Sequence, residues 1–150
     1  MSPATLAPSR LSWKELLALI RRGRVDTVLA VFPDMLGRWM GKRVTGRFFA
    51  DSVAKDGLHA CAYLLTVDME MEPVQGFELT SWERGYGDFH MVPDPRTARL
   101  VPWLPGTALV ICDLLSEGGE PVEVSPRRIL RVQIERAAKR GLRFMMGSEL

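Results

Sequence analysis

Three carboxylates alternate with two methionines in one short stretch of the sequence, Asp68-Met69-Glu70-Met71-Glu72. In an extended chain, alternation with a period of two places the three acidic side chains on one face. Like charges at that spacing repel one another unless a cation or water screens them. The pattern therefore indicates a site for a cation or an amine. A solvated acidic loop, with the methionines tucked beneath it, explains the same pattern.

Other residues able to do chemistry are isolated in the sequence. Glu149 follows Gly147 and Ser148 near the end of an apolar stretch, where its carboxylate could project into a site. A surface position near the terminus is the simpler interpretation. His59 and His90 lie in different predicted strands without a cysteine pair, so we interpret both as hydrogen-bonded sheet residues rather than metal ligands.

Two further charged positions have local explanations. Asp94, between two prolines, is expected to cap a turn through an Asx-type hydrogen bond. Arg127 and Arg128 open a predicted helix, where positive charge is mildly unfavourable. A carboxylate or phosphate partner would offset that charge, and a solvated pair is the alternative. The sequence contains no Gly-rich phosphate-binding loop, no G-x-S-x-G motif and no paired metal-ligand spacing.

A proline-rich segment, 85–106, separates the acidic stretch from a buried strand predicted over 107–115. Four of the ten prolines lie in this segment. Because proline lacks an amide donor and fixes φ, the segment cannot be one long central strand. We predict a short strand at 89–92, a Pro-Asp-Pro turn, an edge strand near 99–101 and a rigid corner at 102–106. This scaffold is expected to hold the acidic stretch in place.

The rest of the pattern predicts a sheet packed by helices. Ser12 and Glu15 form a capping box for an amphipathic helix that ends at Gly23. Ser125-Pro126 is a strong start for a second helix, which Gly141 ends. The remaining predicted elements are a hairpin of strands 25–32 and 38–45, a helix at 46–55 with Phe48, Phe49 and Val53 inward, a strand at 58–67 buried on both faces, an apolar face of the second helix formed by Ile129, Leu130, Ile134, Ala137 and Ala138, and a strand beginning at 142–147.

The composition is that of a globular protein: 47% of the 150 residues are hydrophobic and 25% are charged. The net charge of +2 hides an acidic centre, because residues 25–124 carry eight basic and fifteen acidic residues. This distribution suits a cationic ligand and argues against nucleic acid. Without a membrane-length apolar run or a signal core, we expect a cytoplasmic protein that binds no membrane. Cys61 and Cys112 fall in predicted buried strands, so thiols are favoured over a disulfide.

The order of these pieces resembles the N-terminal region of the glutamine synthetase family. The resemblance covers about 25–150 and is carried by F-P-D-M-L-G-R-W-M-G-K-R-V (32–44), G-D-F-H-M-V-P-D-P-R-T (87–97), V-P-W (101–103), A-L-V-I-C-D (108–113), G-G-E-P-V-E-V-S-P-R-R-I-L (118–130) and G-S-E-L (147–150).

This resemblance implies an α+β fold, with a β-grasp-like mixed sheet packed by helices. The sheet would occupy 25–124, after a tail and helix at 1–24. Residues 125–150 would be a linker helix and the first strand of a catalytic domain. Because the sequence stops as that strand begins, we expect the catalytic domain to be incomplete here.

The resemblance also implies a reaction. Family members use ATP and Mg²⁺ or Mn²⁺ to phosphorylate the γ-carboxylate of glutamate, and an amine then attacks the acyl phosphate. Active sites form between neighbouring subunits of a homo-oligomeric ring, and the N-terminal domain lends an acidic residue that binds or deprotonates the ammonium. Asp68 matches that residue, and Glu149 matches the first glutamate of a metal-binding E-x-E strand. The 150-residue chain alone is expected to be inactive and to bind no cofactor tightly.

The sequence departs from the family pattern at this position. Members that use free ammonia commonly carry D-G-S-S where this chain has D-M-E-M-E-P, beginning at Asp68. The extra carboxylates Glu70 and Glu72 would suit a larger or multiply charged amine, such as a polyamine. The alternative function is a stand-alone β-grasp module that binds a protein partner through 68–84 without catalysis.

Overall fold

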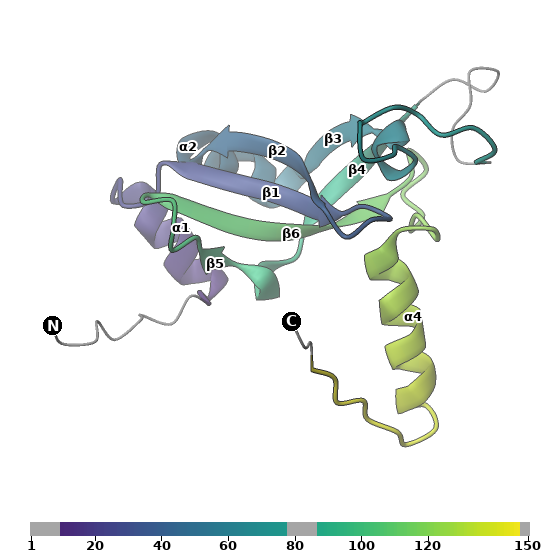
Figure 1. Ribbon diagram of the computed structural model, residues 1–150. Coiled ribbons are helices and arrows are strands. Elements are labelled where there is room, and N and C mark those ends of the chain that lie inside the picture. Colours follow the sequence, from purple (N-terminus) through teal and green to yellow (C-terminus); the bar gives the residue numbers. More distant parts are fainter. Residues whose placement is uncertain (1–9, 78–86, 148–150) are drawn as a thin grey trace, which may run out of the picture.

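A computed structural model describes residues 10–77 and 87–147 of the chain and shows a mixed α+β fold (Figure 1). One sheet has the strand order β2-β1-β6-β4-β3, with β5 beside β6. The strands are β1 Thr27–Pro33, β2 Trp39–Thr45, β3 Leu58–Cys61, β4 Asp88–Pro93, β5 Arg99–Leu100 and β6 Thr107–Leu115. The helices are α1 Trp13–Arg21, α2 Gly46–Phe48, α3 Ala54–Asp56 and α4 Pro126–Ala138, with a π-helical turn at Phe49–Val53 and 3₁₀ turns at Ala62–Leu65 and Pro95–Thr97.

Strand β6 is the centre of the sheet. It pairs in parallel with β1 along one edge, and antiparallel with both β4 and β5 along the other. Between β4 and β5 the ladder is interrupted by the Pro-Asp-Pro turn. There the Thr97 hydroxyl accepts a hydrogen bond from the Ile111 amide at 2.8 Å, in place of a strand carbonyl. The Thr97 side chain therefore replaces the missing strand partner, and this buried amide of β6 keeps a hydrogen bond.

One face of the sheet carries the core. Val28 of β1 and Ala108 of β6 pack with α1 and the helical segment 46–56. Phe32 and Leu114, further along the same two strands, pack with β3, β4 and the 3₁₀ turn at 62–65. Since residues an even number apart in a strand share a face, the two clusters lie side by side on one surface. Phe32 meets Phe89 edge-on, with ring centroids 5.0 Å apart.

Several predicted elements are confirmed. Ser12 and Glu15 form the capping box of α1, with the Ser12 amide donating to the Glu15 carboxylate at 2.8 Å. The hairpin of β1 and β2, the edge strand β5 and the buried strand β6 are all present. No helix in the described ranges is long and apolar enough to cross a membrane.

The strand predicted over 58–67 is wrong beyond its first four residues. Strand β3 ends at Cys61, and a 3₁₀ turn at Ala62–Leu65 follows. Strand β3 lies at the edge of the sheet and pairs with β4, and its His59 is exposed. Ala62 and Leu65 reach the core by turning onto its surface, so their burial does not require an extended chain.

Two smaller expectations also fail. Phe48 is exposed, although it was expected to point inward. Phe49 and Val53 are fully buried; they are four residues apart and share one helical face, whereas Phe48 lies about 100° away from that face. Residues 142–147 form no strand. They run beside α4 without pairing as a strand (Figure 1). Leu130 and Ile134 of this helix share a groove with Phe144, and both are about half exposed.

The apolar face expected on α4 is therefore mostly exposed, and the buried residue of the helix is Ala137.

Candidate functional site

The acidic stretch forms a tight turn rather than an extended strand. Both the Glu70 amide and the Glu72 amide donate to Oδ1 of Asp68, at 3.0 and 2.9 Å. The Asp68 amide donates to the Glu72 carbonyl at 3.0 Å, and Met71 has a φ of 68°. The expected alternation of side chains on one face is therefore wrong, because the period-two rule holds only in extended chain. Asp68 is half-buried, whereas Glu70 and Glu72 are exposed.

Arg38 fixes this turn to the end of the β1–β2 hairpin. Its Nη2 donates to the Asp68 carbonyl at 2.8 Å, and its Nη1 to the Met69 carbonyl at 3.2 Å. Its Nε donates to Oδ2 of Asp34 at 2.7 Å. One guanidinium therefore joins two segments that lie thirty residues apart in the sequence, beside each other in Figure 1.

Asp34 holds Arg38 in this orientation. The Asp34 side chain is 2% exposed, and its Oδ1 accepts from the amides of Leu36 and Arg38 at 2.9 and 2.8 Å. Burial raises the pKa of this carboxyl, but its hydrogen bonds and the charge of Arg38 lower the pKa by more. The pKa therefore lies below its ordinary value. The carboxylate therefore stays ionised at neutral pH and keeps its partner.

We call the hairpin end 34–39 together with the loop 68–77 the acidic rim. Its exposed carboxylates are those of Glu70 and Glu72. The same two segments carry the exposed apolar side chains of Met35, Leu36, Trp39, Met69, Met71, Val74 and Phe77. So many exposed apolar residues in two adjoining segments make the rim a candidate binding surface. Chemically, the rim offers carboxylates to accept hydrogen bonds from an ammonium group and apolar side chains to contact its carbon substituents.

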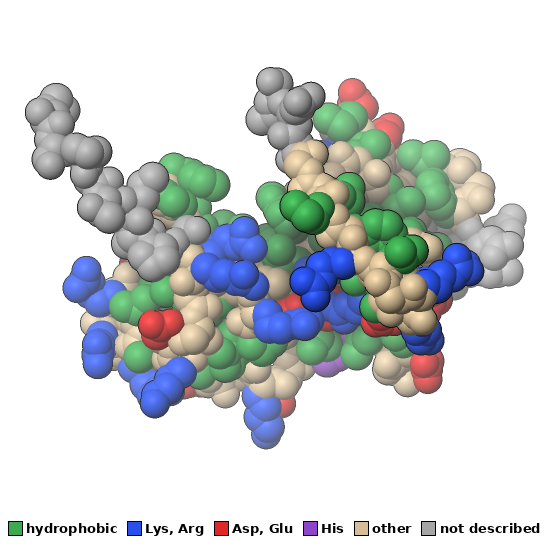
Figure 2. Space-filling view, turned by 90° about the horizontal axis from the view of Figure 1, so that it is seen from below, with side chains coloured by type: hydrophobic (Ala, Val, Ile, Leu, Met, Phe, Trp, Pro, Cys, Tyr) green, Lys and Arg blue, Asp and Glu red, His purple; other side chains and the backbone are tan. Residues whose placement is uncertain are grey.

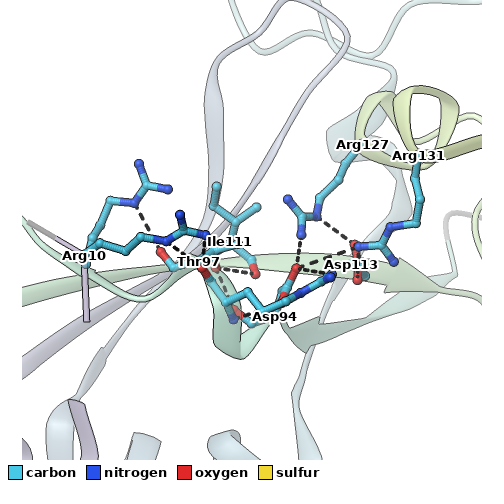
Figure 3. A network of polar contacts seen from close by, with 9 residues as sticks. Arg10, Asp94, Thr97, Ile111, Asp113, Arg127 and Arg131 are labelled. Carbon is cyan, nitrogen blue, oxygen red and sulfur yellow. Dashed lines mark hydrogen bonds and ion pairs between the residues drawn. The ribbon is translucent and has the colours of Figure 1, made fainter. Parts of the chain in front are cut away.

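A second charged cluster lies where α4 meets the sheet (Figure 3). Asp94 caps the Pro-Asp-Pro turn by accepting from the Arg96 amide at 3.0 Å, which confirms the expected Asx-type bond. Arg127 donates to both Asp94 and Asp113, and Arg131 donates to Asp113 at 3.0 Å. Figure 2 shows basic side chains gathered across this face, with acidic ones between them.

This cluster explains the basic start of α4. Arg127 pairs with carboxylates of the sheet, and Arg128 with Glu123 at 3.1 Å. The negative partner expected for Arg127 and Arg128 is therefore a set of carboxylates within the chain itself. A groove of about 540 Å³ runs along Arg96, Arg127 and Arg131, and each of these arginines already pairs with Asp94 or Asp113. The cluster is a structural joint.

The remaining residues singled out in the sequence are the two histidines, the cysteines and Glu149. His90 Nε2 lies 2.6 Å from the Asp56 carbonyl oxygen, as expected for a hydrogen-bonded sheet histidine, and its ring stacks on that of the exposed His59. Cys112 is buried, which raises the pKa of its thiol to about 12, and it forms no disulfide. Glu149 lies outside the described residues. Within 10–77 and 87–147, no three His, Cys, Asp or Glu side chains group closely enough to hold a metal ion.

Sequence reasoning missed Asp34 and Arg38. A weak signal was available, because Pro33-Asp34 and Gly37-Arg38 bracket a turn and an acidic residue four before an arginine can pair with it. Nothing in the spacing indicated that the arginine also reaches the carbonyls of Asp68 and Met69.

Known proteins resemble this chain over most of its length. No protein-family model matches it. It is 50% identical over 140 residues to the γ-glutamylethanolamide synthetase GlnA4 of Streptomyces coelicolor, covering 93% of this chain and 30% of that protein. It is 38% identical to a glutamate–isopropylamine ligase of Pseudomonas, covering 81% of this chain and 27% of the relative.

The fold agrees with these similarities. The solved structure described as a GmaS/ADP complex superposes with a TM-score of 0.63 at 27% identity, over 83% of this chain and 26% of that one. The chain thus spans about 30% of the length of the curated relatives it matches. It belongs to the γ-glutamyl-amine ligase branch of the glutamine synthetase family and corresponds to the N-terminal part of its members.

Proposed function

We propose that this chain is the N-terminal part of an ATP-dependent ligase that joins an amine to the γ-carboxyl group of glutamate. Residues 25–124 would form its β-grasp domain, and 125–150 would lead into the catalytic domain. In a cytoplasmic homo-oligomeric ring, the acidic rim of one subunit would complete the active site of its neighbour. The observation that carries this proposal is the Asp68 turn, which exposes carboxylates at a fixed place on the acidic rim.

The residues of the rim would act on the amine. Both backbone bonds to Asp68 fall on Oδ1, and we assign Oδ2 to accept a hydrogen bond from the ammonium and to take its proton. Glu70 and Glu72 would bind a second positive charge or a polar end of a larger amine. Met69 and Met71 would contact its carbon chain, since methionine adapts to irregular apolar surfaces.

ATP, when bound by the rest of the protein, supplies the phosphoryl group that activates the glutamate carboxylate. The role of the rim is to hold the amine in line with that carboxylate and to deliver it unprotonated, which reduces the entropy cost of the reaction. We assign Glu149 as a metal ligand of the longer protein.

The substrate would be an amine larger than ammonia. Two relatives are named for ethanolamide and isopropylamine products or substrates, and both amines carry a carbon substituent. The exposed apolar side chains of the rim suit such a substituent. The additional carboxylates favour an amine that carries a second charged or polar group, such as a diamine.

The test is an assay of ADP release by the longer protein with glutamate, ATP and a panel of ammonia, ethanolamine, isopropylamine and a diamine. Glu70→Gln with Glu72→Gln should lower kcat/KM for the diamine by about tenfold or more, because charge-assisted hydrogen bonds are lost. Ammonia use should change little.

The matched control replaces Glu117 and Glu120, two exposed glutamates in the turn after β6, with glutamine. It changes the net charge equally and should leave every amine unaffected. Equal loss for ammonia and the diamine would reject the assignment of the two rim glutamates. The 150-residue chain alone should release no ADP.

The exposed apolar side chains of the rim also favour a second candidate function, a module that binds a protein partner without catalysis. ADP release that depends on glutamate and an amine would reject it.

A further inference from the structure

We propose that Arg38 is a positioning residue, which sets the place and shape of the acidic turn 68–72. Its consequence for catalysis rests on the function proposed above, but the positioning itself can be measured in this chain without any activity. The argument depends on the geometry of one guanidinium group and on what holds it.

All three nitrogen atoms of the Arg38 guanidinium are used, and each has a different acceptor. Nε meets the Asp34 carboxylate, while Nη1 and Nη2 meet the carbonyls of Met69 and Asp68. A planar fork of fixed donors can satisfy three acceptors at once, and the compact ammonium of a lysine cannot reach all of them. The side chain is 24% exposed, so water competes only partly for these bonds.

The guanidinium is itself held by a rigid base. Asp34 is buried, and its second oxygen is occupied by the amides of Leu36 and Arg38. The carboxylate therefore cannot rotate away without losing backbone bonds in the hairpin end. Arg38 consequently has one favoured orientation, which points its outer nitrogens at the acidic turn.

The contact falls on the peptide that shapes the turn. The Asp68 carbonyl accepts from Arg38 and also from the Met71 amide at 3.3 Å, while the Asp68 side chain accepts from the amides of Glu70 and Glu72. Met71 adopts a positive φ, which is costly for a residue with a side chain and persists only where neighbours enforce it. Bonds within the loop, including the Val74 amide to the Thr66 carbonyl at 2.8 Å, help to hold this conformation, and Arg38 adds a contact from the hairpin end, thirty residues away.

The first experiment measures amide hydrogen exchange by NMR in the 150-residue chain. In Arg38→Ala, the amides of Glu70 and Glu72 should exchange about tenfold faster, because loss of a charge-assisted anchor opens the turn more often. The Ile111 amide, bonded to Thr97 within the sheet, reports global unfolding, so local opening of the turn is shown by a loss of protection at Glu70 and Glu72 that exceeds the loss at Ile111.

The matched control is Arg47→Ala. Arg47 also lies four residues from its aspartate, Asp51, but both side chains are largely exposed. This variant should leave the amides of Glu70 and Glu72 unchanged. If Arg38→Ala fails to fold, Arg38→Lys decides the question, since it keeps the charge beside Asp34 but loses the fork and should loosen the same two amides. Unchanged exchange there, or no protection of these amides in the unaltered chain, would overturn the proposal.

The second experiment places the same variants in the longer ligase. Arg38→Ala should raise KM for the amine by about tenfold and leave KM for glutamate unchanged, with Arg38→Lys intermediate. Loosened amides with an unchanged amine KM would keep Arg38 as a positioning residue and reject the role of the turn in amine binding. Exchange that is unchanged would reject the positioning role whatever the kinetics show.

Discussion

Two Pro-Asp pairs in this chain make the same local hydrogen bond but have different roles in the structure. Pro33-Asp34 ends β1 and Pro93-Asp94 ends β4. Each aspartate is buried and accepts from the amide two residues later, at 2.9 Å for Leu36 and 3.0 Å for Arg96. Each also pairs with an arginine, and these ion pairs and hydrogen bonds offset the cost of burying the two charges.

The arginines make the difference. Around Asp94 they come from α4 as well as from the turn, and each of them pairs with Asp94 or Asp113. Beside Asp34, the outer nitrogens of Arg38 donate to the carbonyls of Asp68 and Met69. The carboxylates of Glu70 and Glu72 stay exposed. A cluster in which every charged side chain has a partner within the chain joins elements together, whereas one that fixes a backbone and leaves carboxylates exposed can bind a ligand.

The largest expected effect is on stability, at the Asp94 cluster. Asp94→Ala should lower the free energy of unfolding by about 3–5 kcal/mol, because Arg127 loses a buried partner and the Pro-Asp-Pro turn loses its cap. Urea unfolding followed by circular dichroism measures it. Glu123→Ala, which removes an exposed partner of Arg128, is the control and should cost under about 1 kcal/mol. Similar losses in both variants would contradict a structural joint at Asp94.

A smaller effect is expected from pH. The pKa values of Asp34 and Asp94 lie below the unfolded value of 3.8, so the unfolded chain binds protons first as pH falls. Their contribution to stability is complete above about pH 5 and is lost as pH falls through the folded pKa values. Urea midpoints at pH 7, 5 and 3 should therefore fall chiefly in the last step. The drop should be smaller in Asp34→Asn, and a drop of equal size there would contradict the assignment.

The smallest effect on stability is expected at the rim glutamates. Glu70→Gln with Glu72→Gln should change the free energy of unfolding by less than about 0.5 kcal/mol, because both side chains are exposed and Asp68 binds their amides, not their carboxylates. The same urea measurement checks it. A loss above about 1 kcal/mol would show that these carboxylates have structural partners, and would weaken the contrast between the two clusters.

The sequence predicted best where local chemistry decides the structure. The capping box of α1, the Asx bond of Asp94 and the bounds of β6 at Thr107–Leu115 all follow from a few adjacent residues or from a largely apolar run. The stretch 58–67 was misread because a short apolar run does not distinguish an extended strand from a turn packed onto the core. The length of β3 depended on its place at the sheet edge, which only the assembled fold sets.

The candidate site was harder to predict than the fold. Asp68 was singled out, but the shape of its turn was not, because Met71 gives no sign of a positive φ where a glycine would have announced one. Arg38 was missed since its acceptors are main-chain carbonyls thirty residues away, and a carbonyl leaves no trace in the amino-acid sequence. Contacts of that kind appear only once two loops are placed side by side.

The parallel pairing of β1 with β6 has a consequence for how the chain acquires its structure during synthesis. Thr27 pairs with Thr107, so the hairpin of β1 and β2 leaves the ribosome long before the strand that completes its inner edge. Until then that edge offers unpaired amides to any neighbouring nascent chain. Completion of the sheet must therefore wait for a distant segment, and non-local pairing of this kind is intrinsically slow because the loop must close first.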